Sequence, residues 1–300
     1  MLRTEQYQLL DFGEGRRLER FGSVTVDRPC PAAEGIGKAN TAPWMAADAR
    51  FERADSLQGN WFVTGYVPQP WTIRYGPTAF YLKLTPFGQV GVFPEQADNW
   101  HRIHEQFAAG ANAGRSVRVL NLFAYTGGST LAAAAAGAEV VHVDAAKNVV
   151  AWARQNARLS DLAERPIHWI VEDVRKFVRR ELRRGSRYDA VILDPSSYGH
   201  GRRGEVWRLS KHLPGLLAAC AELTSGNCQF LLLTSHTPGF GPERLADMAR
   251  AAFGANETGA LTAEPLGLVS ASGRVLPAGA AVRWQAVRPG QAPAPERKRR

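Results

Sequence analysis

The stretch VRVLNLFAYTGG, residues 117–128, decides the fold. Residues 117–123 form a mostly apolar run of strand length, and a turn with two glycines follows directly. Such a run is typical of a strand that is covered on both faces of its sheet. Glycine lets the backbone turn tightly and approach a ligand closely. The stretch therefore predicts a buried strand, a ligand-binding turn and a helix over residues 129–136.

Downstream, apolar runs of strand length alternate with helical segments. Strands are predicted over residues 139–143, 167–171, 188–193 and 229–234, and helices over residues 146–159, 174–184, 205–224 and 242–253. This alternation predicts an α/β fold with a Rossmann-like, doubly wound and mainly parallel sheet. Two last β-like stretches, residues 260–269 and 280–287, could close the sheet as a hairpin.

The first hundred residues have a different character, with many prolines and short β-like runs over residues 23–26, 61–67 and 71–75. Segments 80–84 and 89–93 flank the turn residues 85–88, which predicts a hairpin, and residues 31–42 are expected to form a loop. We therefore expect three parts. These are a smaller N-terminal β-rich lobe over residues 1–105 that is a candidate for substrate recognition, a ligand-binding domain over residues 106–288, and a basic, disordered tail over residues 289–300.

Composition and charge narrow the class of protein. Hydrophobic residues make up 45% and charged residues 22% of the chain, an ordinary globular balance. No apolar run is long enough to cross a membrane, and three cysteines without a paired motif fit a reducing cytoplasm. The net charge of +9 favours polyanionic partners such as RNA. The arginines over residues 179–187 fit either such a surface or an ordinary solvated helix face.

Ligands of doubly wound sheets bind beyond the carboxyl ends of the strands, and four predicted loops lie there. The first loop, residues 123–130, is neither a GxGxxG nor a Walker A sequence. Asp144 follows the second strand, where a carboxylate can accept hydrogen bonds from both ribose hydroxyls. Glu172 and Asp173 follow the third strand and could accept from an adenine amine or cap the next helix. The fourth loop is residues 194–198.

These motifs, in order and at their spacing, resemble the class I S-adenosylmethionine-dependent methyltransferases. They are most similar to the ribosomal RNA large-subunit methyltransferase family, which includes carbon-5 cytosine enzymes. The resemblance covers roughly residues 87–234. The matching residues are Asn121-Leu122-Phe123-Ala124-Tyr125-Thr126-Gly127-Gly128, Val143-Asp144, Lys147, Asn156-Ala157, Glu172-Asp173-Val174 and Leu193-Asp194-Pro195.

The resemblance implies S-adenosyl-L-methionine as cofactor and assigns roles. The loop of Phe123, Ala124, Tyr125, Thr126, Gly127 and Gly128 would hold the methionine part. Asp144 would hold the ribose, Asp173 with Glu172 the adenine, and Asp194 would line the same site. The segment GVFPEQ, residues 91–96, is similar to a family segment whose glutamine, here Gln96, lies across the cofactor, although a strand end and turn is an equal reading.

The fourth loop carries the chemistry. Methylation of a base nitrogen commonly uses Asp/Asn-Pro-Pro-Tyr/Phe, whereas residues 194–198 read Asp-Pro-Ser-Ser-Tyr. Asp194 and Pro195 match that pattern, and Tyr198 comes one place late. We predict Asp194, Pro195 and Tyr198 as catalytic residues, with an extruded base stacked on Tyr198. No metal site is expected.

Further residues are candidates for binding the substrate. These are Tyr198 itself, His200, Arg202 and Arg203 in a glycine-rich basic loop that could grip phosphate, and His236 after the fifth strand, where a base could act. The related carbon-5 enzymes carry a nucleophilic cysteine after the fifth strand, and this chain has none there.

The sequence thus predicts methylation of a base in ribosomal or other RNA, at nitrogen rather than carbon-5. A methyltransferase acting on a protein or small molecule, a cofactor-binding protein with a decayed active site and, last, a nicotinamide dehydrogenase remain alternatives.

Overall fold

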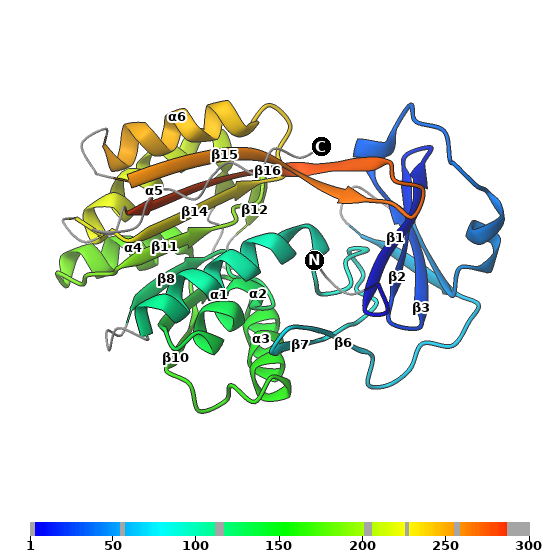
Figure 1. The fold of residues 1–300 in the computed structure, drawn as a ribbon, viewed down its shortest axis with the longest axis horizontal. Helices are drawn as coiled ribbons and strands as arrows, with labels where there is room; N and C mark the ends of the chain where they lie inside the picture. Colours follow the sequence, from blue (N-terminus) through cyan, green and yellow to red (C-terminus); the bar gives the residue numbers. More distant parts are fainter. Residues whose placement is uncertain are drawn as a thin grey trace.

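The computed structural model describes residues 4–54, 58–111, 117–200, 206–225, 228–254 and 259–286. A seven-stranded sheet dominates it, in the order β10-β9-β8-β11-β14-β16-β15 (Figure 1). Its first five strands are parallel, whereas β16 runs antiparallel to both of its neighbours, β14 and β15. The predicted mainly parallel α/β sheet is confirmed. The bounds are β8 (Arg118–Leu122), β9 (Glu139–Asp144), β10 (Ile167–Val171), β11 (Ala190–Leu193), β14 (Phe230–Ser235), β15 (Gly259–Val269) and β16 (Val275–Ala286).

Helices cover both faces of this sheet, which explains why its central strands β8, β11 and β14 are almost entirely buried. On β8, Val119 packs into one core cluster and Leu120 into the other, because successive side chains point to opposite faces. The first face carries α1 (Ala97–Ala111), α2 (Gly128–Ala135) and α3 (Lys147–Leu159), and the second carries α4 (Val174–Arg183), α5 (Leu209–Leu223) and α6 (Pro242–Phe253). None of the described helices is long and apolar enough to span a membrane.

The N-terminal part forms a second, five-stranded sheet in chain order, antiparallel except between β3 and β4. Its strands are β1 (Tyr7–Gly13), β2 (Arg16–Phe21), β3 (Val24–Pro29), β4 (Ala49–Arg53) and β5 (Gly59–Val63), with the short helices η1 (Pro31–Ala33) and η2 (Ala42–Ala46) between β3 and β4. The segment predicted as a loop over residues 31–42 thus holds one short helix and begins another.

Two elements join this sheet to the larger one. The β15–β16 hairpin extends past the central sheet to β1, where the amide of Ala271 donates to the carbonyl of Leu9 at 2.8 Å (Figure 1). One core cluster contains both Phe21 of the N-terminal sheet and Val119 of β8. The division near residue 105 stays a prediction, and that residue lies inside α1. The predicted disordered tail lies outside the described residues.

Several sequence expectations are corrected. The hairpin expected of residues 80–84 with 89–93 forms only in part. The amide of Lys83 donates to the carbonyl of Val90 at 3.0 Å and that of Thr85 to the carbonyl of Gln89 at 3.2 Å, whereas the paired strands are β7 (Thr78–Tyr81) and β6 (Thr72–Tyr75). On its other edge, β7 bonds to α3: the amide of Tyr81 donates to Asn156 Oδ1 at 2.8 Å. The turn at residues 85–88 does form, with Gly88 N donating to the carbonyl of Thr85 at 3.0 Å.

Other elements differ from the sequence expectation at their ends or were not expected. The helix predicted over residues 205–224 begins only at Leu209, because β13 (Val206–Arg208) precedes it and pairs with β12 (Tyr198–His200). The sequence did not predict β1, β2, β4, β12, α1 or the short helix η3 (Pro94–Gln96). The buried positions of β1 and β2 include Asp11 and Glu19, which hides their apolar pattern.

Candidate active site

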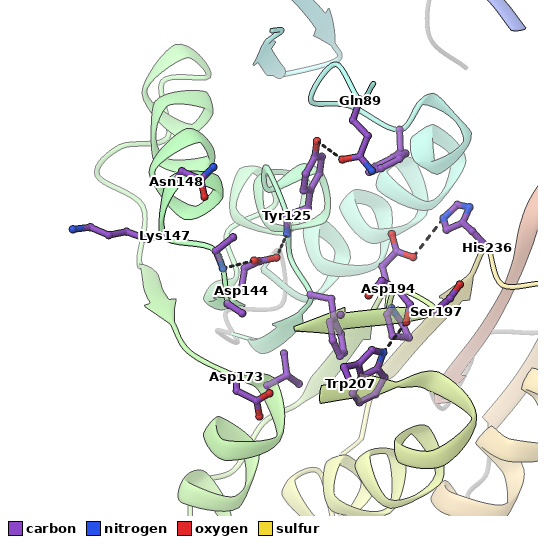
Figure 2. A pocket seen from close by; sticks show the side chains of 18 of the residues that line it. Gln89, Tyr125, Asp144, Lys147, Asn148, Asp173, Asp194, Ser197, Trp207 and His236 are labelled. Atoms are coloured by element: carbon purple, nitrogen blue, oxygen red, sulfur yellow. Dashed lines mark hydrogen bonds and ion pairs between the residues drawn. The ribbon is translucent and has the colours of Figure 1, made fainter. Parts of the chain in front are cut away.

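A cavity of about 1050 Å³ opens beyond the carboxyl ends of β8, β9 and β11 (Figure 2). Three carboxylates that follow three different strands, Asp144, Asp173 and Asp194, line it together. A smaller hollow of about 40 Å³ adjoins it, since both are lined by Phe123, Tyr125 and Asp194. The volume of the main cavity matches the upper end of the range for small-molecule sites, about 1,000 Å³, so the cavity has room for a nucleoside cofactor and a substrate group.

The first loop after β8 has an unusual backbone. Phe123, Tyr125 and Gly127 have positive φ angles of 57°, 49° and 94°. Positive φ is uncommon for aromatic residues and costs about 1–3 kcal/mol each, so the surrounding structure must hold the loop. Thr126 Oγ1 donates to the carbonyl of Gly91 at 2.7 Å, and Asn156 Nδ2 donates to the carbonyl of Thr126 at 3.0 Å. The loop is thereby fixed in a tight turn at the start of α2.

Asp144 joins this loop to the end of β9. Its Oδ2 accepts from the amide of Tyr125 at 3.0 Å and its Oδ1 from the amide of Ala146 at 2.9 Å. Burial raises the pKa of the Asp144 carboxyl, and the amide hydrogen bonds oppose that rise. Each oxygen keeps a lone pair for a further donor, so the side chain can still accept from two hydroxyls.

The two carboxylates after β10, Glu172 and Asp173, have different surroundings. Asp173 lines the cavity and caps α4, accepting from the amide of Lys176 at 3.0 Å, so both roles foreseen for it are compatible. Glu172 is not among the lining residues and pairs instead with Arg180 at 2.5 Å. Of the two, Asp173 is the one positioned to meet a ligand.

Asp194 lies in a polar cluster at the end of β11. Its Oδ1 accepts a short hydrogen bond from Thr234 Oγ1 at 2.5 Å, and its Oδ2 accepts from Gln96 Nε2 at 3.4 Å. His236 Nε2 lies 3.6 Å from Asp194 Oδ1 (Figure 2). Burial raises the pKa of Asp194, but the hydrogen bond and the charge of His236 outweigh this effect and bring the pKa below its usual value. The carboxylate is therefore ionised.

His236 stands between two carboxylates, with Nδ1 3.8 Å from Glu95 Oε1. Burial lowers its pKa, whereas Asp194 and Glu95 raise it, and the balance brings the pKa of His236 to about 9. The imidazole is therefore protonated at neutral pH, and it can act as a base only once this pairing is broken. Glu95 is itself buried, and its Oε2 has no hydrogen-bond partner among the described residues.

Aromatic rings form the remaining wall. Phe123 packs against Trp207 of β13 with ring centroids 4.9 Å apart, and Phe93 packs against Tyr125 at 5.2 Å. Trp207 Nε1 donates to the carbonyl of Ser196 at 2.7 Å, which fixes the loop that follows Asp194. A flat ligand entering the cavity would thus meet apolar ring surfaces beside the three carboxylates.

Most of the predicted site residues lie together in or beside this cavity. Pro195 lines it, while Gln96, Ala124, Thr126 and Gly128 line the smaller hollow. Gly127 caps α2 behind the wall, where an added Cβ would lie 3.3 Å from the Cβ of Ala153. Tyr198 is 49% exposed on β12 and is not among the lining residues. The side chain of His200, and Arg202 and Arg203 entirely, lie outside the described residues.

Sequence reasoning missed Trp207, Phe93 and Glu95 as parts of the site. Trp207 was assigned to the helix predicted over residues 205–224. An aromatic residue shortly after the Asp194 loop could have indicated a ring that lines the cavity. Phe93 and Glu95 lie within the GVFPEQ segment, for which only the glutamine was considered. Lys147 matched the family pattern and Ser197 lies in the fourth loop, but neither was assigned a role. Other lining residues had no signal of their own: Gln89, Asn148, Ala151 and Thr237.

Comparisons with known proteins bear on the whole arrangement. A solved S-adenosylmethionine-dependent methyltransferase from Agrobacterium tumefaciens is 36% identical, covers 93% of this chain and 90% of its own, and superposes with a TM-score of 0.85. Ribosomal RNA large subunit methyltransferase K/L of Shewanella sp. is 33% identical over 52% of this chain. Ribosomal RNA large subunit methyltransferase I of Aeromonas hydrophila is 36% identical over 38% of it. The chain spans only 21% and 27% of the length of these two curated relatives.

The model of one protein family matches residues 39–258, which is most of the chain and more than the predicted range of resemblance. That family is described as S-adenosylmethionine-dependent methyltransferase. The match excludes the nicotinamide dehydrogenase that the sequence left open. The chain belongs to the S-adenosylmethionine-dependent methyltransferase family, with S-adenosylmethionine as its cofactor.

Proposed function

We propose that this protein transfers a methyl group to a nitrogen of a base in RNA. The observation that carries the proposal is that Asp194 opens into the same cavity as Asp144 and Asp173. One cavity thereby offers carboxylates for a nucleoside cofactor and a carboxylate for an amine acceptor. The two curated relatives are named as ribosomal RNA methyltransferases, which supports RNA as the substrate.

The residues of the cavity fit the cofactor. Asp144 would accept from the ribose hydroxyls, Asp173 from the adenine amine, and the tight loop around Tyr125 would hold the methionine part. Bound there, the cofactor supplies an electrophilic methyl group. The rest of the work is positioning, since correct placement of two reactants alone removes much of a reaction barrier.

Asp194 is the residue that would orient the acceptor. An ionised carboxylate accepts hydrogen bonds and thus selects a group that carries hydrogens, such as an amine or ring N–H. The rings of Phe123 and Trp207 would stack on the base once it has left its helix. We assign stacking to these two rings in preference to Tyr198, which lies outside the cavity lining.

Carbon-5 chemistry fits less well. That reaction needs a cysteine nucleophile beside the base. All three cysteines are buried, and none is among the lining residues of the described cavity. Burial also raises the pKa of the Cys220 thiol far above its usual range, which disfavours the reactive thiolate.

The test is transfer of labelled methyl from S-adenosylmethionine to the RNA, protein and small-molecule fractions of cells that lack this protein. We expect label in RNA, recovered after digestion in an N-methylated nucleoside. Asp194→Ala should keep its cofactor affinity in calorimetry but stop the transfer. Label in protein or small molecules would favour a methyltransferase that acts on that class of substrate. Cofactor binding without any transfer would indicate a decayed active site.

A further inference from the structure

One helix holds most of the chain's net charge. Residues 174–187 contain seven cations, Arg175, Lys176, Arg179, Arg180, Arg183, Arg184 and Arg187, against a single carboxylate, Glu181. This segment alone thus contributes +6 of the net +9. It comprises α4 and the turn that follows it.

The structure turns the single carboxylate inward and the cations outward. Val174, Phe177 and Val178 are buried against the sheet. Glu181 is buried with them and accepts from the hydroxyl of Tyr188 at 2.9 Å. The outward face of α4 therefore presents positive charge only, and we call this surface the α4 cationic face: Arg175, Lys176, Arg179, Arg180, Arg183 and Arg184.

Part of this charge is unbalanced. Arg175, Arg180 and Arg184 each lie within ion-pair distance of a carboxylate, at 3.7, 2.5 and 3.3 Å. Arg179 and Arg183 are exposed, and no carboxylate among the described residues lies within ion-pair distance of either. Arg179 and Arg183 are also four residues apart on one helix face, where like charges repel.

Helix stability does not account for this arrangement. The helix dipole favours cations in the last turn, which suits Arg180 and Arg183. Arg175 and Lys176 lie in the first turn, where the dipole disfavours cations. The cations of the first turn are disfavoured by the helix dipole, and the cations along the face repel one another. Binding of an external polyanion explains this arrangement better than helix stability does.

The α4 helix begins at the edge of the cavity. Asp173, the N-cap of α4, lines the cavity, and the helix leads away from it for about 15 Å at 1.5 Å per residue (Figure 2). An RNA chain with one nucleotide in the cavity can therefore pass along this face. Guanidinium groups match phosphate oxygens in a two-pronged geometry and position a nucleic acid without reading its sequence.

We propose that the α4 cationic face binds the phosphate backbone of the RNA next to the nucleotide that enters the cavity. This inference rests on the proposed function, because it takes RNA as the substrate. Arg179 and Arg183, whose charges are not balanced, make the contacts that matter most.

The test compares Arg179→Ala/Arg183→Ala with a matched variant, Arg154→Ala/Arg158→Ala, which removes the same charge from two exposed positions on α3 that are also four residues apart. Alanine is the best helix former, so the first pair should fold. Binding of transcribed large-subunit ribosomal RNA is measured at salt concentrations between about 50 and 200 mM. We expect the α4 variant to bind about tenfold more weakly and its salt slope to fall by about 2, because two phosphate contacts are lost.

The control variant should retain the wild-type slope, and both variants should bind S-adenosylmethionine as the wild type does. If the wild type methylates RNA but the α4 variant keeps its affinity and slope, this inference is overturned and the proposed function stands. If the wild type methylates no RNA, the proposed function and this inference both fail. Equal weakening in the α4 and control variants would show a general charge effect and would also overturn the inference.

Discussion

At the scale of single residues, Asp144 has two tasks that only a carboxylate meets. It holds the Tyr125 and Ala146 amides, and it still has acceptor capacity toward the cavity. Hydrogen bonds to a charged group contribute about 1.5–3 kcal/mol each. The side chain is thus placed to decide cofactor affinity.

We predict that Asp144→Ala weakens S-adenosylmethionine binding at least about 100-fold in calorimetry, the loss of roughly two such bonds. Glu172→Ala is the matched control, because it removes a nearby carboxylate that pairs with Arg180 and lies outside the lining. The control should bind normally. Wild-type affinity in Asp144→Ala would remove this residue from the site.

His236 makes stability depend on pH. Its pKa rises from 6.5 in the unfolded chain to about 9 in the folded one, so folding favours the protonated imidazole. The contribution is complete below pH 6.5 and is lost as pH rises through about 9. Since the imidazole is partly exposed, solvent screening keeps it to about 1 kcal/mol or less.

We therefore predict that wild type loses its stability advantage over His236→Gln between pH 6.5 and about 9, measured by urea unfolding at each pH. An NMR titration of the ring should place its midpoint near 9. A midpoint near 6.5, with a pH-independent difference between the two proteins, would contradict the pairing with Asp194 and Glu95.

At the scale of elements, the loop after β8 depends on a neighbour far away in sequence. Gly91 has a φ of 103°, and a Cβ there would lie 2.1 Å from the ring of Trp152. Its carbonyl also accepts from Thr126 Oγ1 at 2.7 Å. A side chain at position 91 would therefore displace both α3 and the loop.

We predict that Gly91→Ala lowers the free energy of unfolding by about 3 kcal/mol, combining overpacking with backbone strain. Gly76→Ala is the control, because Gly76 also has a positive φ, 53°, but no atom of the described residues lies within 4 Å of its Cβ position. It should cost about 1–2 kcal/mol, the strain alone. Equal losses in urea unfolding would show that the contact with Trp152 does not matter.

Elements also show where sequence reasoning succeeds. Asp144, Asp173 and Asp194 were found because each lies at or just after the end of a predicted strand, and parallel strands bring their carboxyl ends to one edge. Trp207 and Glu95 were not found, because their place depends on tertiary contacts. Trp207 belongs to a three-residue strand that pairs with the equally short β12, and Glu95 reaches the site through a short helix before α1.

At the scale of the whole molecule, the N-terminal sheet was the least predictable part. Its core includes the carboxylates of Asp11, Glu19 and Asp27, which interrupt the apolar pattern. Arginines of β2 and β3 pair with Glu19 and Asp27, whereas the partner of Asp11 is 263 residues away in sequence. Arg274, at the tip of the β15–β16 hairpin, donates to Asp11 and to the carbonyl of Phe12 at 2.8 Å. This contact joins the two sheets.

We predict that Arg274→Ala lowers the free energy of unfolding by about 2 kcal/mol, since it removes charge-assisted hydrogen bonds from a buried carboxylate. Arg250→Ala, which breaks an exposed pair with Asp247 at 3.0 Å, should change it by no more than about 0.5 kcal/mol. Urea unfolding of both variants measures this. A loss no larger than that of Arg250→Ala would show that the hairpin tip does not stabilise the molecule.

The proposed function of the whole molecule is methylation of a base nitrogen in RNA. Mass spectrometry of the nucleosides of ribosomal RNA from cells with and without this protein tests that claim most directly. We predict that one N-methylated nucleoside is lost from cells without the protein and returns with the wild-type chain but not with Asp194→Ala. Identical nucleosides in both cells, or the loss of 5-methylcytidine instead, would contradict it.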